Sequence, residues 1–145
     1  MPRRRGPPRA LENQHVDILL CDHQTFVSLS NGDALKVTLA RLVPEVRGAK
    51  SATLVIVIHG VNSSDTRVSF PFSAGPDGLH WEDFTTLLDS GSSTGVAQGT
   101  SHPGSATDVT RFMNLQVSVK VERTSGGAAA QKSVTISAWL SLKPF

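Results

Sequence analysis

The sequence lacks the features that identify several large classes of protein. Of its 145 residues only Cys21 is a cysteine, so no intrachain disulfide can form. No apolar run approaches the roughly 18 residues of a membrane-spanning helix, so we expect no membrane partner. There is no phosphate-binding loop and no dinucleotide fingerprint, and the five histidines include no pair at the spacing of a zinc site. The sequence therefore predicts no metal, no cofactor and no small-molecule substrate.

Charge is also scarce, and most of its imbalance lies at one end of the chain. Asp, Glu, Lys and Arg make up 18% of the residues, and the formal net charge is +2. The first residues contain a cluster of arginines, at Arg3, Arg4, Arg5 and Arg9. Arginine clusters bind polyanions through charge and forked hydrogen bonds, and they need no folded frame. We predict that residues 1–14 form a mobile basic arm; the alternative is a solvated tail or an expression leader.

The alternation of apolar and polar residues predicts that residues 15–145 form an all-β domain. The alternation is strictest in "LQVSVKVER" and "SVTISAWLSLK", and a flexible Gly126-Gly127 link joins these two runs. Two such runs around a Gly-Gly link predict an antiparallel hairpin of residues 115–122 and 133–142. Strands at roughly even spacing with almost no helix predict an antiparallel β-sandwich, and in particular a single jelly roll.

Other segments supply further strands and turns. Short apolar runs at 16–20 and 25–30 predict two strands, and "NGD" after them is a turn signal because Asn and Gly tolerate positive φ. The unbroken apolar run at 52–58 predicts a strand that is buried on both faces. Pro71 predicts that its own strand lies at a sheet edge or ends there, because proline has no amide hydrogen to donate.

One segment has the period of a helix. In "LHWEDFTTLLDSG" the apolar residues recur at spacings of three and four, which predicts one short amphipathic helix with Trp81, Phe84, Leu87 and Leu88 on one face. Residues 90–107 follow, with many Gly, Ser and Thr and no apolar period. Loops of this length in compact domains are usually functional or disordered, so we expect a long loop here.

The few aromatic side chains follow the apolar pattern. Aromatic residues make up 6% of the chain. A stacking platform for single-stranded nucleic acid needs exposed aromatic rings beside cations, and the pattern places none there. We therefore assign the following residues to the core or to subunit contacts: Phe26, Phe70, Phe72, Phe84 and Trp139.

An enzymatic interpretation starts from two motifs. The run "TLVIVIHG" ends in His59 and Gly60, and "GSSTG" at 91–95 matches the G-x-S-x-G pattern of a serine nucleophile. That pattern needs a buried strand before the serine and a helix after it, whereas Ser93 follows a predicted helix and precedes a Gly- and Pro-containing loop. We therefore predict no catalytic residue and no enzyme, and we interpret Cys21 as a small buried hydrophobe. A small serine hydrolase is a minor alternative.

Three stretches occur in a recognisable order: the arm "PRRRGPPR", the central "TLVIVIHG" and the closing "LQVSVKVER…SVTISAWLSLKPF". This organisation resembles the single jelly-roll coat proteins of small icosahedral RNA viruses, including plant viruses and their satellites. The resemblance implies a homo-oligomeric shell, with the arm facing the interior and contacting RNA independently of its sequence. It also implies a location in the virion, and in the host cytoplasm during assembly. The main alternative is a non-viral β-sandwich binding module, such as a histone-chaperone-like or carbohydrate-binding domain.

Overall fold

The computed structural model describes residues 16–42, 49–75, 82–89, 101–103, 107–108 and 114–144. These ranges consist of β-strands and the loops between them. The strands are β1 (Val16–Val27), β2 (Leu35–Leu42), β3 (Ala49–Val61), β4 (Thr66–Gly75), β5 (Glu82–Asp89), β6 (Ser101–Pro103), β7 (Thr107–Asp108), β8 (Asn114–Arg123) and β9 (Ser133–Pro144).

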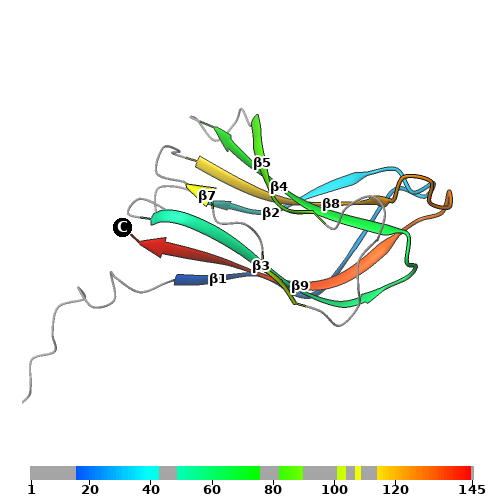
Figure 1. The fold of residues 1–145 in the computed structure, drawn as a ribbon, viewed down its shortest axis with the longest axis horizontal. Coiled ribbons are helices and arrows are strands. Elements are labelled where there is room, and N and C mark those ends of the chain that lie inside the picture. The colour runs from blue at the N-terminus through cyan, green and yellow to red at the C-terminus, as the bar shows by residue number, and fades with distance from the viewer. Residues whose placement is uncertain are drawn as a thin grey trace, which may run out of the picture.

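The strands form two antiparallel sheets that pack face to face (Figure 1). Sheet A has the order β1-β9-β3-β6, with β7 also pairing with β3, and sheet B has the order β2-β8-β4-β5. Apart from β4–β5 and β6–β7, each strand is followed by one in the opposite sheet. Two four-strand layers joined by such crossings make a jelly roll, in which β6 and β7 together fill one strand position. The predicted fold class, an all-β single jelly roll, is confirmed.

The core lies between the two sheets and is built from the apolar positions of the alternating strands. On β8 the alternate residues from Leu115 to Val121 are fully buried, and on β9 those from Val134 to Leu140 are buried in the same way. Phe70 and Phe72 of β4 are completely inaccessible and are the largest fully buried side chains among the described residues. The period of two in the sequence therefore identified correctly which face of β8 and of β9 is buried.

The predicted hairpin of residues 115–122 and 133–142 is wrong. These residues form strands, but β8 pairs with β2 and β4 in sheet B, whereas β9 pairs with β1 and β3 in sheet A. The segment between them, which includes Gly126 and Gly127, crosses from one sheet to the other. Sheets in a sandwich lie roughly 10 Å apart. The connection at residues 124–132 spans that distance easily, whereas a two-residue hairpin turn does not.

The predicted helix is also wrong, because Glu82–Asp89 is a strand. Its backbone pairs antiparallel with β4, with Phe72 opposite Thr85 and Ala74 opposite Glu82. The apolar spacing of this segment fits a helix, but β4 offers it a neighbouring strand edge, and tertiary pairing overrides a weak local preference. Trp81, which belonged to the predicted apolar face, lies outside the described residues.

Three further strand predictions need correction. The two short strands expected at 16–20 and 25–30 are parts of one strand, β1, with register shifts between Leu19 and Gln24. The run at 52–58 is buried on one face only, since Val55 and Val57 are half-buried. Pro71 lies inside β4, which has β8 on one side and β5 on the other. The β4–β5 register shifts between Ser69 and Pro71, and such an irregularity interrupts the regular backbone hydrogen bonds, so a residue without an amide hydrogen fits there.

The loops at one end of the sandwich are tied to one another by hydrogen bonds. The Ser28 amide donates to the Lys132 carbonyl at 2.8 Å, and the Lys132 amide donates to Ser28 Oγ at 2.8 Å. In the same way the Asn62 amide donates to the Ser133 carbonyl at 3.2 Å, and the Ser133 amide donates to Asn62 Oδ1 at 2.9 Å. The β1–β2, β3–β4 and β8–β9 connections therefore form one hydrogen-bonded layer.

Gly32 of the "NGD" turn is the position in this layer where a side chain is least tolerated. Its φ is +89°, and an added Cβ would lie 2.9 Å from both the Ala130 carbonyl oxygen and Arg123 Cδ. We predict that Gly32→Ala lowers the free energy of unfolding by about 1–3 kcal/mol, because strained backbone and a backbone clash act together. Urea unfolding measures this loss, and Gly60→Ala is the control, since nothing lies within 4 Å of a Cβ there. Equal losses in the two variants would contradict the assignment.

Candidate functional site

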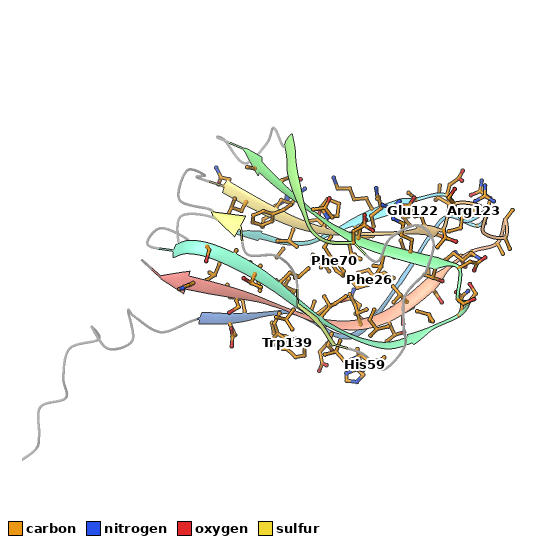
Figure 2. The ribbon with its side chains drawn as sticks, viewed as in Figure 1. Phe26, His59, Phe70, Glu122, Arg123 and Trp139 are labelled. Atoms are coloured by element: carbon orange, nitrogen blue, oxygen red, sulfur yellow. The ribbon has the colours of Figure 1, made fainter. Side chains whose placement is uncertain are left out.

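The outer face of sheet A carries a row of large apolar side chains. Leu19 of β1 and Val55 of β3 both pair with Trp139 of β9, so the three side chains lie side by side across the sheet. They point away from the core, and Figure 2 shows Trp139 on the far side of the sheet from Phe70. Leu19 is 54% exposed, and Trp139 and Val55 are half-buried. We call Leu19, Val55 and Trp139 the apolar row.

Two histidines stack beside the apolar row. The rings of His23 from β1 and His59 from β3 are parallel to within 14°, and their centroids are 3.7 Å apart. Ser137, on the intervening strand β9, lies beneath them: its Oγ is 2.8 Å from His59 Nε2, and the His23 amide donates to it at 3.0 Å. Small Ser137 therefore gives two side chains from non-adjacent strands the room to meet above β9.

An irregularity in β1 places His23 in this position. The pairing of β1 with β9 shifts register between Leu19 and Cys21 and again between Cys21 and Gln24. His23 has a φ of +48°, the only positive φ among the described non-glycine residues. Bulges re-aim side chains, and a non-glycine residue in the left-handed region costs about 1–3 kcal/mol. The surrounding contacts therefore hold His23 in a conformation that its backbone alone would not choose.

The hydrogen bonds around this pair fix the positions of most of its protons. When Ser137 Oγ donates to Asp22 Oδ1, at 3.1 Å, it accepts from His59 Nε2–H. His23 Nδ1 lies 2.7 Å from the same Asp22 oxygen and donates to it. The hydrogen bonds from His23 and Ser137 hold the pKa of the Asp22 carboxyl below its ordinary value. We call Asp22, His23, His59 and Ser137 the histidine cluster.

The histidine cluster contains the residue types of a hydrolase triad without its arrangement. In a triad the histidine lies between the serine and the carboxylate and accepts the serine proton. Here Ser137 gives its proton directly to Asp22, and the residue is only 1% exposed beneath the two rings. No group of three His, Cys, Asp or Glu side chains that could hold a metal occurs within the described residues.

The outer face of sheet B is different in character, because charged side chains line it. Arg67 of β4 makes a two-pronged ion pair with Asp89 of β5, at 3.0 and 2.6 Å. On β8, Lys120 Nζ lies 3.5 Å from Glu122 Oε2. Lys36 of β2 lies opposite Lys120 in the register of the two strands. Beside these charged groups the same face has buried polar residues, since Ser69, Gln116 and Ser118 are each less than 8% exposed.

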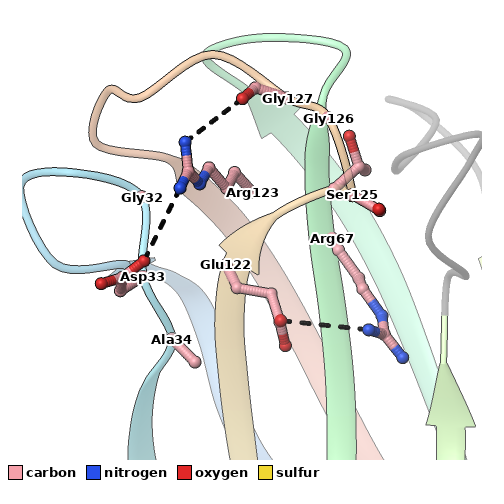
Figure 3. A pocket seen from close by; sticks show the side chains of 10 residues that line it. Gly32, Asp33, Ala34, Arg67, Glu122, Arg123, Ser125, Gly126 and Gly127 are labelled. Carbon is pink, nitrogen blue, oxygen red and sulfur yellow. Dashed lines mark hydrogen bonds and ion pairs between the residues drawn. The ribbon is translucent and has the colours of Figure 1, made fainter.

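An open pocket of about 380 Å3 lies where the β1–β2 turn meets the β8–β9 loop (Figure 3). Its charged groups face each other: Arg123 lies 4.0 Å from Asp33 and donates to the Gly127 carbonyl at 3.4 Å. Arg67 Nη1 lies 3.9 Å from Glu122. Because these charges pair across the pocket, the lining does not select an ionic ligand.

The residues singled out from the sequence have different outcomes. The arm, with Arg3, Arg4, Arg5 and Arg9, lies outside the described residues, and so does Ser93. Cys21 is 6% exposed, and burial raises the pKa of its thiol, so its interpretation as a buried hydrophobe is confirmed. Phe26, Phe70 and Phe72 belong to the core, whereas Trp139 is on the outer face. His59 was weighed for the hydrolase motif and, like His23, for a zinc pair, but the contact between the two rings was not predicted.

Comparison with solved structures gives matches in viral particles, whereas no protein-family model and no curated protein match the sequence. VP2 from the subviral particle of infectious bursal disease virus superposes with a TM-score of 0.58 at 16% identity, over 90% of this chain and 32% of VP2. T=1 particles derived from that virus give 0.54 at 13% identity, over 90% and 32%. The Gx strain gives 0.53 at 13% identity, over 89% and 31%. The chain thus spans about a third of the length of these capsid chains.

These identities are low, so the likeness concerns the fold alone. The described residues contain no helix that is long and apolar enough to cross a membrane. What the neighbours share with this chain is the all-β sandwich, and they are viral capsid proteins. The chain therefore has a viral capsid-like jelly-roll fold.

Proposed function

We propose that this protein is a structural, non-enzymatic subunit of a viral shell, which many copies build by self-association. The observation that carries the proposal is the sheet order, β1-β9-β3-β6 facing β2-β8-β4-β5, in a fold that matches capsid chains over about nine-tenths of this chain. Jelly rolls of this kind serve as shell-building units in viruses. More specifically, we propose that the shell is small and icosahedral, that it encloses RNA, and that the protein is located in the virion.

Two features of the site support a structural role over catalysis. The polar residues that converge, in the histidine cluster, are arranged to hold one another rather than to attack a substrate. Beside them the apolar row includes Leu19, which is 54% exposed. Exposed apolar rows with an aromatic residue are typical of protein contacts.

Sedimentation velocity of the purified full chain at neutral pH tests this function. We expect a discrete species many times heavier than the 15.4 kDa chain, because shells are closed point-group assemblies. A monomer at micromolar to millimolar concentration would overturn the proposal.

We further propose that Arg3, Arg4, Arg5 and Arg9 contact RNA from the inside of the shell. The support is the local cluster of arginines in a chain of otherwise low charge. Phosphate contacts carry no sequence information, so binding should be independent of RNA sequence. A single arm binds weakly, and many arms on one RNA give useful avidity.

Removing residues 2–9 should therefore abolish RNA retention while leaving the sandwich folded. The ratio of absorbance at 260 and 280 nm of full-length and truncated protein measures this effect. In filter binding of one chain to single-stranded RNA, log K should fall against log salt with a slope of about −3, for at most four neutralised phosphates. Equal nucleic-acid content in both proteins would show that the arm does not retain RNA.

A further inference from the structure

We propose that, in the protein free of RNA, the basic arm folds back over the outer face of its own sheet A. Residues 7–8 then pack on the apolar row, and Arg5 and Arg9 pair with two carboxylates beside the row. This inference goes beyond the proposed function, since the contact requires neither a shell nor RNA. It assigns an occupant to an apolar surface on which Leu19 is largely exposed.

The outer face of β1 carries a carboxylate on each side of the apolar row. Asp17 and Leu19 both point outward, since Ile18 between them packs against the core. Beyond the register shifts Asp22 lies on the same face, and the two hydrogen bonds that it accepts both go to Oδ1. Both carboxylates are exposed, and Lys143 of β9 lies on this face toward the same end as Asp17. On β1 and β9 this face therefore has two carboxylates against one ammonium group.

The arm has the complementary order of residues. Arg5 and Arg9 lie on either side of residues 6–8, which are Gly-Pro-Pro. At the polyproline II rise of about 3.1 Å per residue, the two arginines are about 12 Å apart along the arm. Asp17 and Asp22 are five residues apart on a strand, about 16 Å less what the irregularity in β1 takes up. Long arginine side chains cover the remaining difference, so both ion pairs and the proline contact can form together.

The apolar row itself suits a pair of prolines. Its central side chain is the indole of Trp139, between Leu19 and Val55. Proline-rich segments in the polyproline II conformation dock on aromatic surfaces, and their backbone needs no internal hydrogen bonds. The fixed φ of proline also means that residues 7–8 lose little conformational entropy on docking. RNA suits this face less well, because the two carboxylates repel its phosphates.

The arm is long enough for this contact and joins the sandwich at the right place. It leads into Val16, the first residue of β1, which is the strand that carries both carboxylates. Residues 10–15 connect Arg9 to this strand and can span up to roughly 20 Å. A chain that returns over the face of a sheet needs to rise only about 10 Å above it. The arm then runs antiparallel to β1, with Arg9 nearest Asp17, and the contact needs no second copy.

Acrylamide quenching of Trp139 fluorescence tests whether the arm covers the row. The full chain carries Trp81→Phe, so that Trp139 is its one indole, and nucleic acid is removed at high salt beforehand. Removing residues 2–9 should raise the quenching constant at least about twofold, because the outer face of the ring is then open to the quencher. Circular dichroism checks that the shortened chain is folded. Equal quenching constants in the two chains would overturn the proposal.

The double variant Asp17→Asn, Asp22→Asn tests the two ion pairs. It removes both charges and keeps an oxygen that can accept the hydrogen bonds from His23 and Ser137. Two exposed ion pairs together change the docking equilibrium by about two- to thirtyfold, so quenching in the full chain should rise toward that of the shortened chain. The matched control is the same double variant without residues 2–9, where we expect no change. No rise in the full chain, or an equal rise in both, would overturn the role of the carboxylates.

Refolding two chains together tests whether the arm covers its own row. A full chain with Trp81→Phe and Trp139→Phe, which has an arm but no indole, is unfolded in urea with an equal amount of the shortened chain that keeps Trp139. After joint refolding we expect the shortened chain to keep its high quenching constant. A constant that falls toward that of the full chain would place the arm on another copy and overturn the intrachain contact. The outcome is separate from the shell function, since a chain that stays monomeric gives the same quenching results.

Discussion

Replacing Val119 by aspartate should lower the free energy of unfolding by several kcal/mol. Val119 lies at the centre of β8 with no exposed surface, among core residues of both sheets. A carboxylate at this position would be buried without a partner, or would have to be protonated, and either costs several kcal/mol. Single domains have a free energy of unfolding of about 5–15 kcal/mol, so this one change removes a large part of it. Circular dichroism and urea unfolding measure the loss.

The neighbouring Val37→Asp is the control for that experiment. Val37 lies directly opposite Val119 in the β2–β8 register, but it is on an edge strand and is 38% exposed. We expect a loss below about 1 kcal/mol there, from lower strand preference and some lost packing. Similar losses at the two positions would mean that β8 is not a central strand.

The second large effect concerns Lys132, the one lysine among the buried residues of the described part of the chain. Its side chain is 2% exposed, and its Nζ lies 2.7 Å from Asp65 Oδ1. Lys132→Ala should lower the free energy of unfolding by about 2–5 kcal/mol, because it leaves a cavity where the aliphatic stem packs. Lys132→Met fills that space and should cost less than about 2 kcal/mol, since Asp65 keeps its bonds from Ser63 and Ala128. Equal losses would show that the charge matters more than the packing.

The same ion pair makes stability sensitive to acid. The hydrogen bond from Lys132 first, and then those from Ser63 and the Ala128 amide, hold the pKa of Asp65 well below its ordinary value of 3.8. The folded pKa is lower than the unfolded one, so this contribution is fully present above about pH 4 and is lost as the pH falls further. Lys132→Met should therefore lose less stability than the wild type between about pH 4 and pH 2. Urea unfolding across that range measures the difference, and parallel curves would contradict it.

Local patterns in the sequence predicted the all-β sandwich and the buried faces of β8 and β9, because each of these two strands carries its own alternation. Leu115, Val117, Val134 and Ile136 are all in the core, as the period of two requires. Which strand pairs with which is not local. The β8–β9 link looks the same in sequence whether it turns back within one sheet or crosses to the other, so the hairpin was predicted wrongly.

The sequence predicted neither the strand at residues 82–89 nor the histidine pair, and the reasons are related. Residues 82–89 are a strand because β4 lies beside them, and their spacing alone is compatible with a helix. His23 and His59 meet only because β9, from the end of the chain, lies between β1 and β3. The register shift that aims His23 at its partner leaves no signal in the sequence around Cys21. A contact that depends on three distant strands needs the topology before it can be found.

Negative-stain electron microscopy of the purified full-length protein, at neutral pH and without other components, tests the central claim most directly. We expect closed shells of uniform diameter, because the fold matches that of capsid chains over about nine-tenths of this chain and the apolar row includes the exposed Leu19. A field of separate 15.4 kDa monomers, or of irregular aggregates with no closed particle, would contradict it.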